Sequence, residues 1–134
     1  MLRPKSKSKL FWTAVVWADS LELELVIVNL LRNASEAQGS LSEPIRISVT
    51  QAENKVEISI LDKGRNLSEE ELEKLKVPLT STKENGMGLG LTIVKTIVEA
   101  HRGKISFKRN TDVGLTVTVS FPLVKDGFEW QAQK

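Results

Sequence analysis

The chain has 134 residues, of which 40% are hydrophobic and 27% are charged, and its formal net charge is +2. These values predict one globular domain with a single core and argue against disorder. The chain contains no cysteine and one histidine, His101, which excludes disulfides, thiolate zinc sites, cysteine nucleophiles and multi-histidine metal sites.

The positive charge is concentrated at the N-terminus. Arg3, Lys5, Lys7 and Lys9 lie in residues 1–9 with no acidic residue among them, so the rest of the chain is slightly acidic. We therefore interpret residues 1–9 as a solvated basic arm and expect no nucleic-acid interface. The apolar stretch that follows is shorter than the ~20 residues that span a bilayer. We expect a cytoplasmic domain that makes no membrane contact.

The first half of the chain predicts a strand, a helix and a hairpin. Residues 10–17 are rich in aromatic and β-branched side chains and favour a strand. Asp19 or Ser20 is expected to cap a helix over residues 21–37, which Gly39 ends. Helical spacing places these residues on its apolar face: Leu23, Val26, Ile27, Leu30 and Ala34. Alternating residues 45–50 and 56–60 predict a β-hairpin.

The second half predicts two helices and two strands. Ser68 and Glu71 form a capping box at the start of a short acidic helix that ends near Leu75. Residues 78–88 have the composition of a loop, and residues 89–101 a helix. The expected apolar face of that helix contains Leu89, Ile93, Ile97 and Ala100. A strand around residues 105–107 and a turn at 110–112 precede a long alternating strand over 113–121.

Together these elements predict an α/β fold, a two-layer sandwich in which three helices cover one face of a mixed five-stranded sheet. The domain is expected to occupy residues 10–124, with residues 125–134 as a tail.

Two asparagines form the first candidate functional motif. Asn29 and Asn33 are four residues apart and therefore share a side of the first helix, on a polar stripe with Glu22 and Glu36 opposite the apolar face. Neutral amide oxygens suit Mg²⁺ that also keeps water and phosphate ligands. Taken alone, the pair is more typical of a solvated helix face, because asparagine is common on exposed helix turns.

Two glycine-containing segments form the other motifs. Asp62 leaves a strand just before Gly64, where a carboxylate can accept a hydrogen bond and a ligand can approach the backbone. Gly86, Gly88 and Gly90 come just before and at the start of a predicted helix, with Lys83 upstream. Free N–H groups and the positive dipole end at a helix N-terminus bind phosphate. The three motifs predict a magnesium-dependent nucleotide site.

In this order the motifs resemble a known family. NLLRNASEA, LDKG and TSTKENGMGLGLTIVKTIVEAHRGKI are similar to the N-box and the two glycine boxes of the ATP-binding catalytic domain of bacterial sensor histidine kinases. This domain belongs to the superfamily of gyrase and the heat-shock chaperone ATPases, whose ATP-binding fold is the Bergerat type. The TSTK and GMGLGL residues of the last segment are most similar to those of the nitrogen-regulation branch.

The resemblance implies a role for each matching residue. Asn33 corresponds to the magnesium ligand, and Asn29 replaces the glutamate base of the hydrolases, so hydrolysis is expected to be slow. Asp62 corresponds to the aspartate that binds the adenine amino group, and Thr116 to its supporting threonine. The implied contacts to the nucleotide come from Asn33, Asp62, Gly64, Lys83, Gly86, Gly88, Leu89, Gly90 and Thr116, with Asn29, Asn33 and Lys83 acting in catalysis. His101 corresponds to a structural histidine.

The implied function is transfer of the γ-phosphoryl group of Mg-ATP to a histidine on a phosphoacceptor domain of the same or another chain, and indirectly to a response regulator. The isolated domain is expected to be monomeric. Asn66 replaces a glycine of the first glycine box, and Lys76 and Leu79 replace aromatic residues before the lid. Two alternatives stay open: a serine kinase similar to the anti-sigma factors, or a degenerate nucleotide- or partner-binding module.

Overall fold

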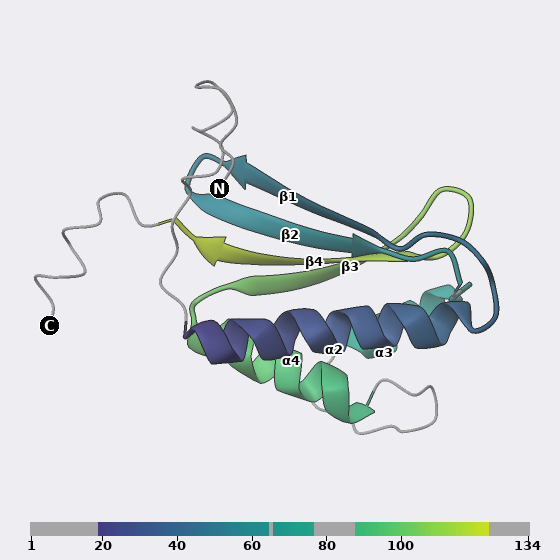
Figure 1. Ribbon diagram of the computed structural model, residues 1–134, viewed down its shortest axis with the longest axis horizontal. Helices are drawn as coiled ribbons and strands as arrows, with labels where there is room; N and C mark the ends of the chain where they lie inside the picture. The colour runs from purple at the N-terminus through teal and green to yellow at the C-terminus, as the bar shows by residue number, and fades with distance from the viewer. Residues whose placement is uncertain (1–18, 65, 77–87, 124–134) are drawn as a thin grey trace, which may run out of the picture.

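The computed structural model describes residues 19–64, 66–76 and 88–123. In these residues three helices and four strands follow one another along the chain: α2 (Ser20–Gln38), β1 (Arg46–Ala52), β2 (Lys55–Leu61), α3 (Glu69–Lys76), α4 (Gly88–Ala100), β3 (Lys104–Arg109) and β4 (Leu115–Pro122). Figure 1 shows α2 lying along the sheet with α4 beside it. The two-layer α/β arrangement is confirmed.

The sheet differs from the expected mixed five-stranded sheet. Its strand order is β1-β2-β4-β3, and each neighbouring pair of described strands is antiparallel. The hairpin between β1 and β2 is confirmed, with Ala52 opposite Lys55. The strand predicted over residues 10–17 lies outside the described residues, so the described sheet has four strands and no parallel pair.

The first helix is fixed by its two caps and its apolar face. Asp19 accepts hydrogen bonds from the backbone N–H groups of Leu21 and Glu22 at 2.9 and 3.1 Å. Gly39, with φ 56°, donates its N–H to the carbonyl oxygen of Ser35. The predicted apolar face is confirmed: Val26, Leu30 and Ala34 are buried, and Leu23 and Ile27 pack against the core.

The predicted apolar face of α4 is partly wrong. The residues of α4 in the core are Leu91, Val94, Ile97 and Val98, whereas Ile93 is 40% exposed and Ala100 is exposed. Nearly every position of this helix is apolar or small, so its sequence permits more than one apolar face. The packing against α2 and the sheet selects the face with Leu91, Val94 and Val98, which follow one another at helical spacing.

The short helix α3 is fixed at both ends. The predicted capping box is confirmed: Ser68 Oγ accepts the N–H of Glu71, and a Glu71 carboxylate oxygen accepts the N–H of Ser68. At the other end Lys95 Nζ of α4 donates to the carbonyl oxygen of Leu75. Burial lowers the pKa of Lys95, whose ammonium also lies 5.7 Å from the centre of the Phe107 ring. Helix α3 is therefore attached to α4, and an ion pair between Glu69 and Arg109 connects it to β3.

The core lies between the helices and one face of the sheet. Alternate residues of β4 are buried there, among them Leu115, Val117 and Val119. Strand β1 is less buried than β4. Its residues Ile47 and Val49 lie opposite Ile60 and Ile58 of β2 on the same face of the sheet, but they are 50% and 62% exposed.

Among the described residues, no helix of the structure is long and apolar enough to cross a bilayer.

His101 connects the end of α4 to the start of α2. Its Nε2 accepts the backbone N–H of Asp19 at 3.2 Å, and its Nδ1 lies 2.7 Å from the carbonyl oxygen of Ile97. The ring also makes an edge contact with Phe121. These contacts agree with the structural role that the resemblance implies.

We predict that Asp19→Ala lowers the free energy of unfolding by about 1 kcal/mol, because two N–H groups at the start of α2 lose their acceptor. Asp19→Asn, which keeps an oxygen acceptor, should lose only a fraction of this. Urea unfolding monitored by circular dichroism measures both values. Equal stability of the wild type and Asp19→Ala would contradict the assigned cap.

Candidate functional site

The two asparagines of α2 are buried. Asn29 is 7% exposed and Asn33 is 9% exposed, which rules out the solvated helix face as their explanation. The predicted position of the two asparagines opposite the apolar face is wrong: they lie at the edge of that face, on the side of α2 that meets α4, while Glu22 and Glu36 are exposed. Two amide side chains thus lie inside the molecule, where polar groups require partners.

A glycine allows α4 to approach Asn29. An added Cβ on Gly90 would lie 2.9 Å from Asn29 Oδ1 and 3.8 Å from Asn33 Oδ1. A larger residue at this position would crowd the Asn29 amide, so that either this amide or the first turn of α4 would have to shift. The helix begins at Gly88, so the N–H groups of its first turn, which have no acceptor within the helix, and its positive dipole end lie beside the asparagines.

The two amides differ in their hydrogen bonds. Asn29 Nδ2 donates to the carbonyl oxygen of Leu25 at 2.8 Å, which fixes the orientation of its amide. Asn33 Nδ2 is buried and has no hydrogen-bond partner among the described residues. A buried amide without a partner is unfavourable by about 1–3 kcal/mol. Asn33 is therefore the group in this region that a polar ligand would satisfy.

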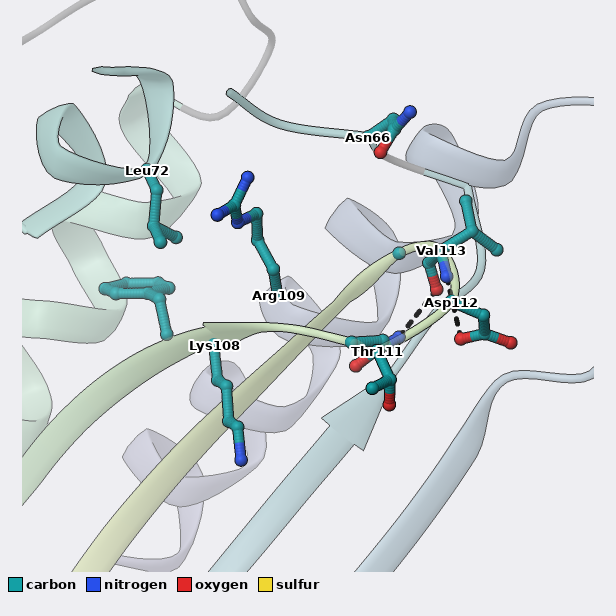
Figure 2. Close-up of a pocket in the computed structure, with 10 residues that line it drawn as sticks. Asn66, Leu72, Lys108, Arg109, Thr111, Asp112 and Val113 are labelled. Carbon is teal, nitrogen blue, oxygen red and sulfur yellow. Dashed lines mark hydrogen bonds between the residues drawn. The ribbon is translucent and has the colours of Figure 1, made fainter. Parts of the chain in front are cut away.

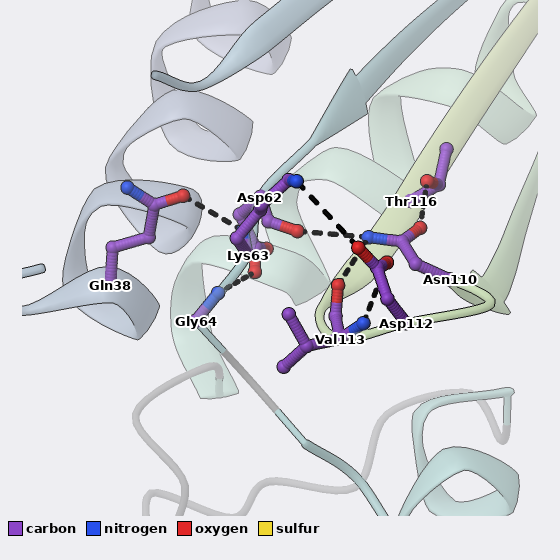
Figure 3. Close-up of polar contacts among 8 residues, drawn as sticks. All are labelled: Gln38, Asp62, Lys63, Gly64, Asn110, Asp112, Val113 and Thr116. Atoms are coloured by element: carbon purple, nitrogen blue, oxygen red, sulfur yellow. Dashed lines mark hydrogen bonds and ion pairs between the residues drawn. The ribbon is translucent and has the colours of Figure 1, made fainter. Parts of the chain in front are cut away.

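Asp62 lies at the end of β2 and is 4% exposed. One oxygen of its carboxylate accepts the N–H of Gly64 at 2.9 Å, a turn that the short side chain of aspartate favours (Figure 3). Its own N–H donates to the carbonyl oxygen of Leu115 at 3.0 Å. The carboxylate is thus held at a fixed place just beyond the end of β2.

Gly64 joins this segment to α2. An added Cβ would collide with the carbonyl of Ala37 and lie 2.6 Å from Gln38 Cα. Because Asn29, Asn33 and Ala37 follow one another at four-residue spacing, they form one stripe of α2, about 12 Å long. The stripe meets Gly90 near its first residue and Gly64 near its last.

Thr116 is not brought to the carboxylate of Asp62 in the described contacts. Its neighbours Leu115 and Val117 are buried toward the helices, so Thr116 lies on the other face of β4. Its hydroxyl donates to Asn110 Oδ1 at 2.6 Å, and Asn110 Nδ2 donates to the backbone carbonyl of Asp62 at 3.0 Å. Thr116 reaches Asp62 through Asn110, which was predicted only as part of a turn.

The remaining predicted site residues are described in part or not at all. Lys83 and Gly86 lie outside the described residues, as does Leu79 of the altered lid segment. Gly88 and Leu89 are placed as backbone of α4. Asn66 is exposed at the start of the connection to α3.

A separate pocket of about 490 Å³ lies between the start of α3 and the turn that joins β3 to β4 (Figure 2). Leu72 and Arg109 lie on one side of it and Asn66 and Val113 on the other. The Arg109 guanidinium donates to the carbonyl oxygen of Leu67 and to the Glu69 carboxylate, so its charge is paired. The lining does not include Asn29, Asn33 or Asp62, so this pocket is distinct from the stripe on α2.

Comparison with known proteins gives a consistent result. The family model described as histidine kinase-, DNA gyrase B-, and HSP90-like ATPase matches residues 18–125. Sporulation kinase B of Bacillus subtilis (strain 168) is 35% identical over 108 residues, which is 81% of this chain and 25% of that protein. The C4-dicarboxylate transport sensor protein DctS of Rhodobacter capsulatus is 36% identical over 115 residues, which is 84% of this chain and 18% of that protein.

A solved structure agrees with these relatives. The catalytic domain of histidine kinase ThkA superposes with a TM-score of 0.68 at 36% identity, covering 80% of this chain and 70% of that one. The chain spans a quarter or less of the two curated relatives above, which are kinases and sensors of different kinds. The similarity to the nitrogen-regulation branch therefore stays a prediction. The chain belongs to the family of histidine kinase-, DNA gyrase B- and HSP90-like ATPases, and it is similar to the catalytic domain of the histidine kinase ThkA.

Proposed function

We propose that this domain binds Mg-ATP along the stripe of α2 and provides its γ-phosphoryl group to a histidine on a separate phosphoacceptor domain in two-component signalling. The observation that carries the proposal is the stripe of Asn29, Asn33 and Ala37, which meets the N-terminus of α4 near one end and the Asp62–Gly64 segment near the other. A nucleotide needs these two ends, one for its phosphates and one for its base.

The base end is provided by Asp62. A buried carboxylate held by the N–H of Gly64 can accept a hydrogen bond from the exocyclic amine of adenine. Guanine presents a carbonyl oxygen at the equivalent ring position, which a carboxylate repels. Asp62 therefore favours adenine nucleotides.

The phosphate end combines α4 with the two asparagines. The N–H groups in the first turn of α4 are suited to phosphate oxygens, and Lys83, Gly86 and Gly88 are proposed to complete this contact. The buried amide of Asn33 fits a Mg-nucleotide, because a side-chain amide provides a donor for a phosphate oxygen or, rotated about its last bond, an oxygen for the cation. Bound Mg²⁺ would neutralise charge on the phosphates.

Asn29 limits reaction with water. Its amide nitrogen already donates to Leu25, and an amide oxygen is too weak a base to remove a proton from water. The domain therefore holds ATP until a histidine nitrogen attacks the γ-phosphorus, forming the P–N bond as the bond to the ADP oxygen breaks. Positioning and charge neutralisation supply the catalysis.

We predict that Asn33→Ala weakens Mg-ATP binding roughly 10- to 100-fold, the range for losing a hydrogen bond or ligand contact to a charged group. Isothermal titration calorimetry with and without Mg²⁺ measures the affinity. Ser35→Ala, an exposed neighbour in the same helix, serves as the matched control and should bind as the wild type does. Unchanged Mg-ATP binding by Asn33→Ala would show that Asn33 is not the metal ligand.

We also predict transfer of label from γ-³²P-ATP to a helical phosphoacceptor domain supplied separately, for example from a related sensor kinase. The labelled bond should be acid-labile, as for phosphohistidine, and label should be absent when that histidine is replaced. Acid-stable label on serine would instead support the serine-kinase alternative. Tight nucleotide binding without transfer to several such domains would support a binding module.

A further inference from the structure

The backbone of the Asp62-Lys63-Gly64 segment is held from two sides by buried or half-buried amide side chains. Figure 3 shows Gln38 on one side and Asn110 on the other. Neither belongs to the motifs that identify the family in this sequence. Each makes hydrogen bonds to main-chain atoms, so the position of the segment depends on them.

Gln38 fixes the side that faces α2. It is the last residue of α2 and is 9% exposed. Its Oε1 accepts the N–H of Lys63 at 2.8 Å, and its Nε2 donates to the carbonyl oxygen of Glu43 at 2.7 Å. The side chain therefore connects the end of α2, the following loop and the residue next to Asp62.

Asn110 fixes the opposite side. Its Nδ2 donates to the carbonyl oxygens of Asp62 at 3.0 Å and Val113 at 2.9 Å, and its Oδ1 accepts the hydroxyl of Thr116. All three bonds use polar atoms of one half-buried side chain. The turn between β3 and β4 is thereby attached to the backbone of Asp62.

Two close backbone contacts lie beside these hydrogen bonds. Gly64 packs on the carbonyl of Ala37, and Gly114, with φ 97°, packs on the carbonyl of Asp62, so that an added Cβ at either glycine would collide. The turn itself is held by Asp112, whose carboxylate accepts the N–H of Val113 at 2.7 Å. This hydrogen bond is the main reason why the pKa of Asp112 lies below its usual value, and Lys63 adds to the effect at 3.7 Å.

We infer that Gln38 and Asn110 are positioning residues for base selection, because they set the place and angle at which the Asp62 carboxylate meets the nucleotide base. This inference rests on the proposed function. A carboxylate that moves by a fraction of an ångström loses hydrogen-bond geometry to an exocyclic amine, although the fold around it persists. Each residue acts through Asp62 and does not itself contact the base.

The test measures the affinities of Mg-ADP and Mg-GDP by calorimetry at a temperature well below unfolding. The Asp62→Ala variant shows how much ADP affinity and preference for ADP over GDP are lost when the carboxylate is absent. Asn110→Ala and Gln38→Met should each weaken ADP binding up to roughly tenfold, as for one hydrogen bond, and reduce the preference for ADP over GDP. Gln38→Glu keeps an acceptor for the N–H of Lys63 and should lie nearer the wild type than Gln38→Met does.

Thr118→Val is the matched control. Thr118 lies on β4, as Thr116 does, but farther from Asp62, and its hydroxyl makes a hydrogen bond with Ser59 of β2. The substitution removes this bond, so it should lower stability without changing the preference for ADP over GDP. Amide hydrogen exchange gives a second readout that needs no nucleotide: exchange at Lys63 should be faster in Gln38→Met than in the wild type.

The outcomes separate the two proposals. If the wild type prefers ADP and the folded Asn110→Ala and Gln38→Met variants keep its affinities, the positioning role is overturned and the proposed function stands. If the wild type binds neither nucleotide, the proposed function fails and the inference fails with it. If the preference falls equally in Thr118→Val, general destabilisation explains the effect and the inference is wrong.

Discussion

The site depends on the close approach of α4 to α2. Gly90 lies directly against Asn29, and this contact brings the first turn of α4, whose N–H groups have no acceptor within the helix, beside the two buried amides. The same packing buries Val94 and Val98 against the core residues of α2, so stability of the fold and formation of the site have one origin. A side chain at this position would crowd the Asn29 amide.

The site is polar but contains few charges in its described part. Two neutral amides and one carboxylate are buried, and the Nδ2 of Asn33 is left without a partner among the described residues. The cost of burying such a group is repaid when a ligand binds it. Because this Nδ2 is a donor, it favours a ligand that presents an acceptor oxygen, as a nucleotide phosphate does. In the pocket between α3 and the β3–β4 turn, the Arg109 guanidinium is already paired with Glu69.

Local sequence patterns predicted the elements that depend on local interactions. The Asp19 cap, the Ser68 and Glu71 capping box and the β1–β2 hairpin all involve residues close in sequence, and all are confirmed. The apolar face of α4 was predicted less well, since an almost uniformly apolar helix carries little periodic signal. Only its contacts with α2 and the sheet decide which side is buried.

In the site, too, the features that depend on local sequence were predicted, and those that depend on packing between distant segments were not. The motifs predicted that Asn29, Asn33, Asp62 and Gly90 would matter, but not that both asparagines would be buried beside α4, because this depends on packing between distant segments. Thr116 lies one residue from Leu115, and a shift of one residue in a strand moves a side chain to the opposite face. The sequence around Gln38 and Asn110 does not indicate that either residue contacts the Asp62–Gly64 segment, because each lies more than 20 residues away from it.

The central claim is that one nucleotide lies along the stripe from Gly90 to Gly64. Titration of the isotope-labelled domain with Mg-ADP, followed by NMR, tests it most directly. We expect the largest chemical-shift changes at the Asn33 side-chain amide, the backbone N–H of Gly90 and the N–H groups of Lys63 and Gly64, with little change at Ser59 and Thr118. Chemical-shift changes confined to the pocket between α3 and the β3–β4 turn, for example at Arg109 and Thr111, would contradict this binding mode. The absence of chemical-shift changes at millimolar Mg-ADP would contradict it as well.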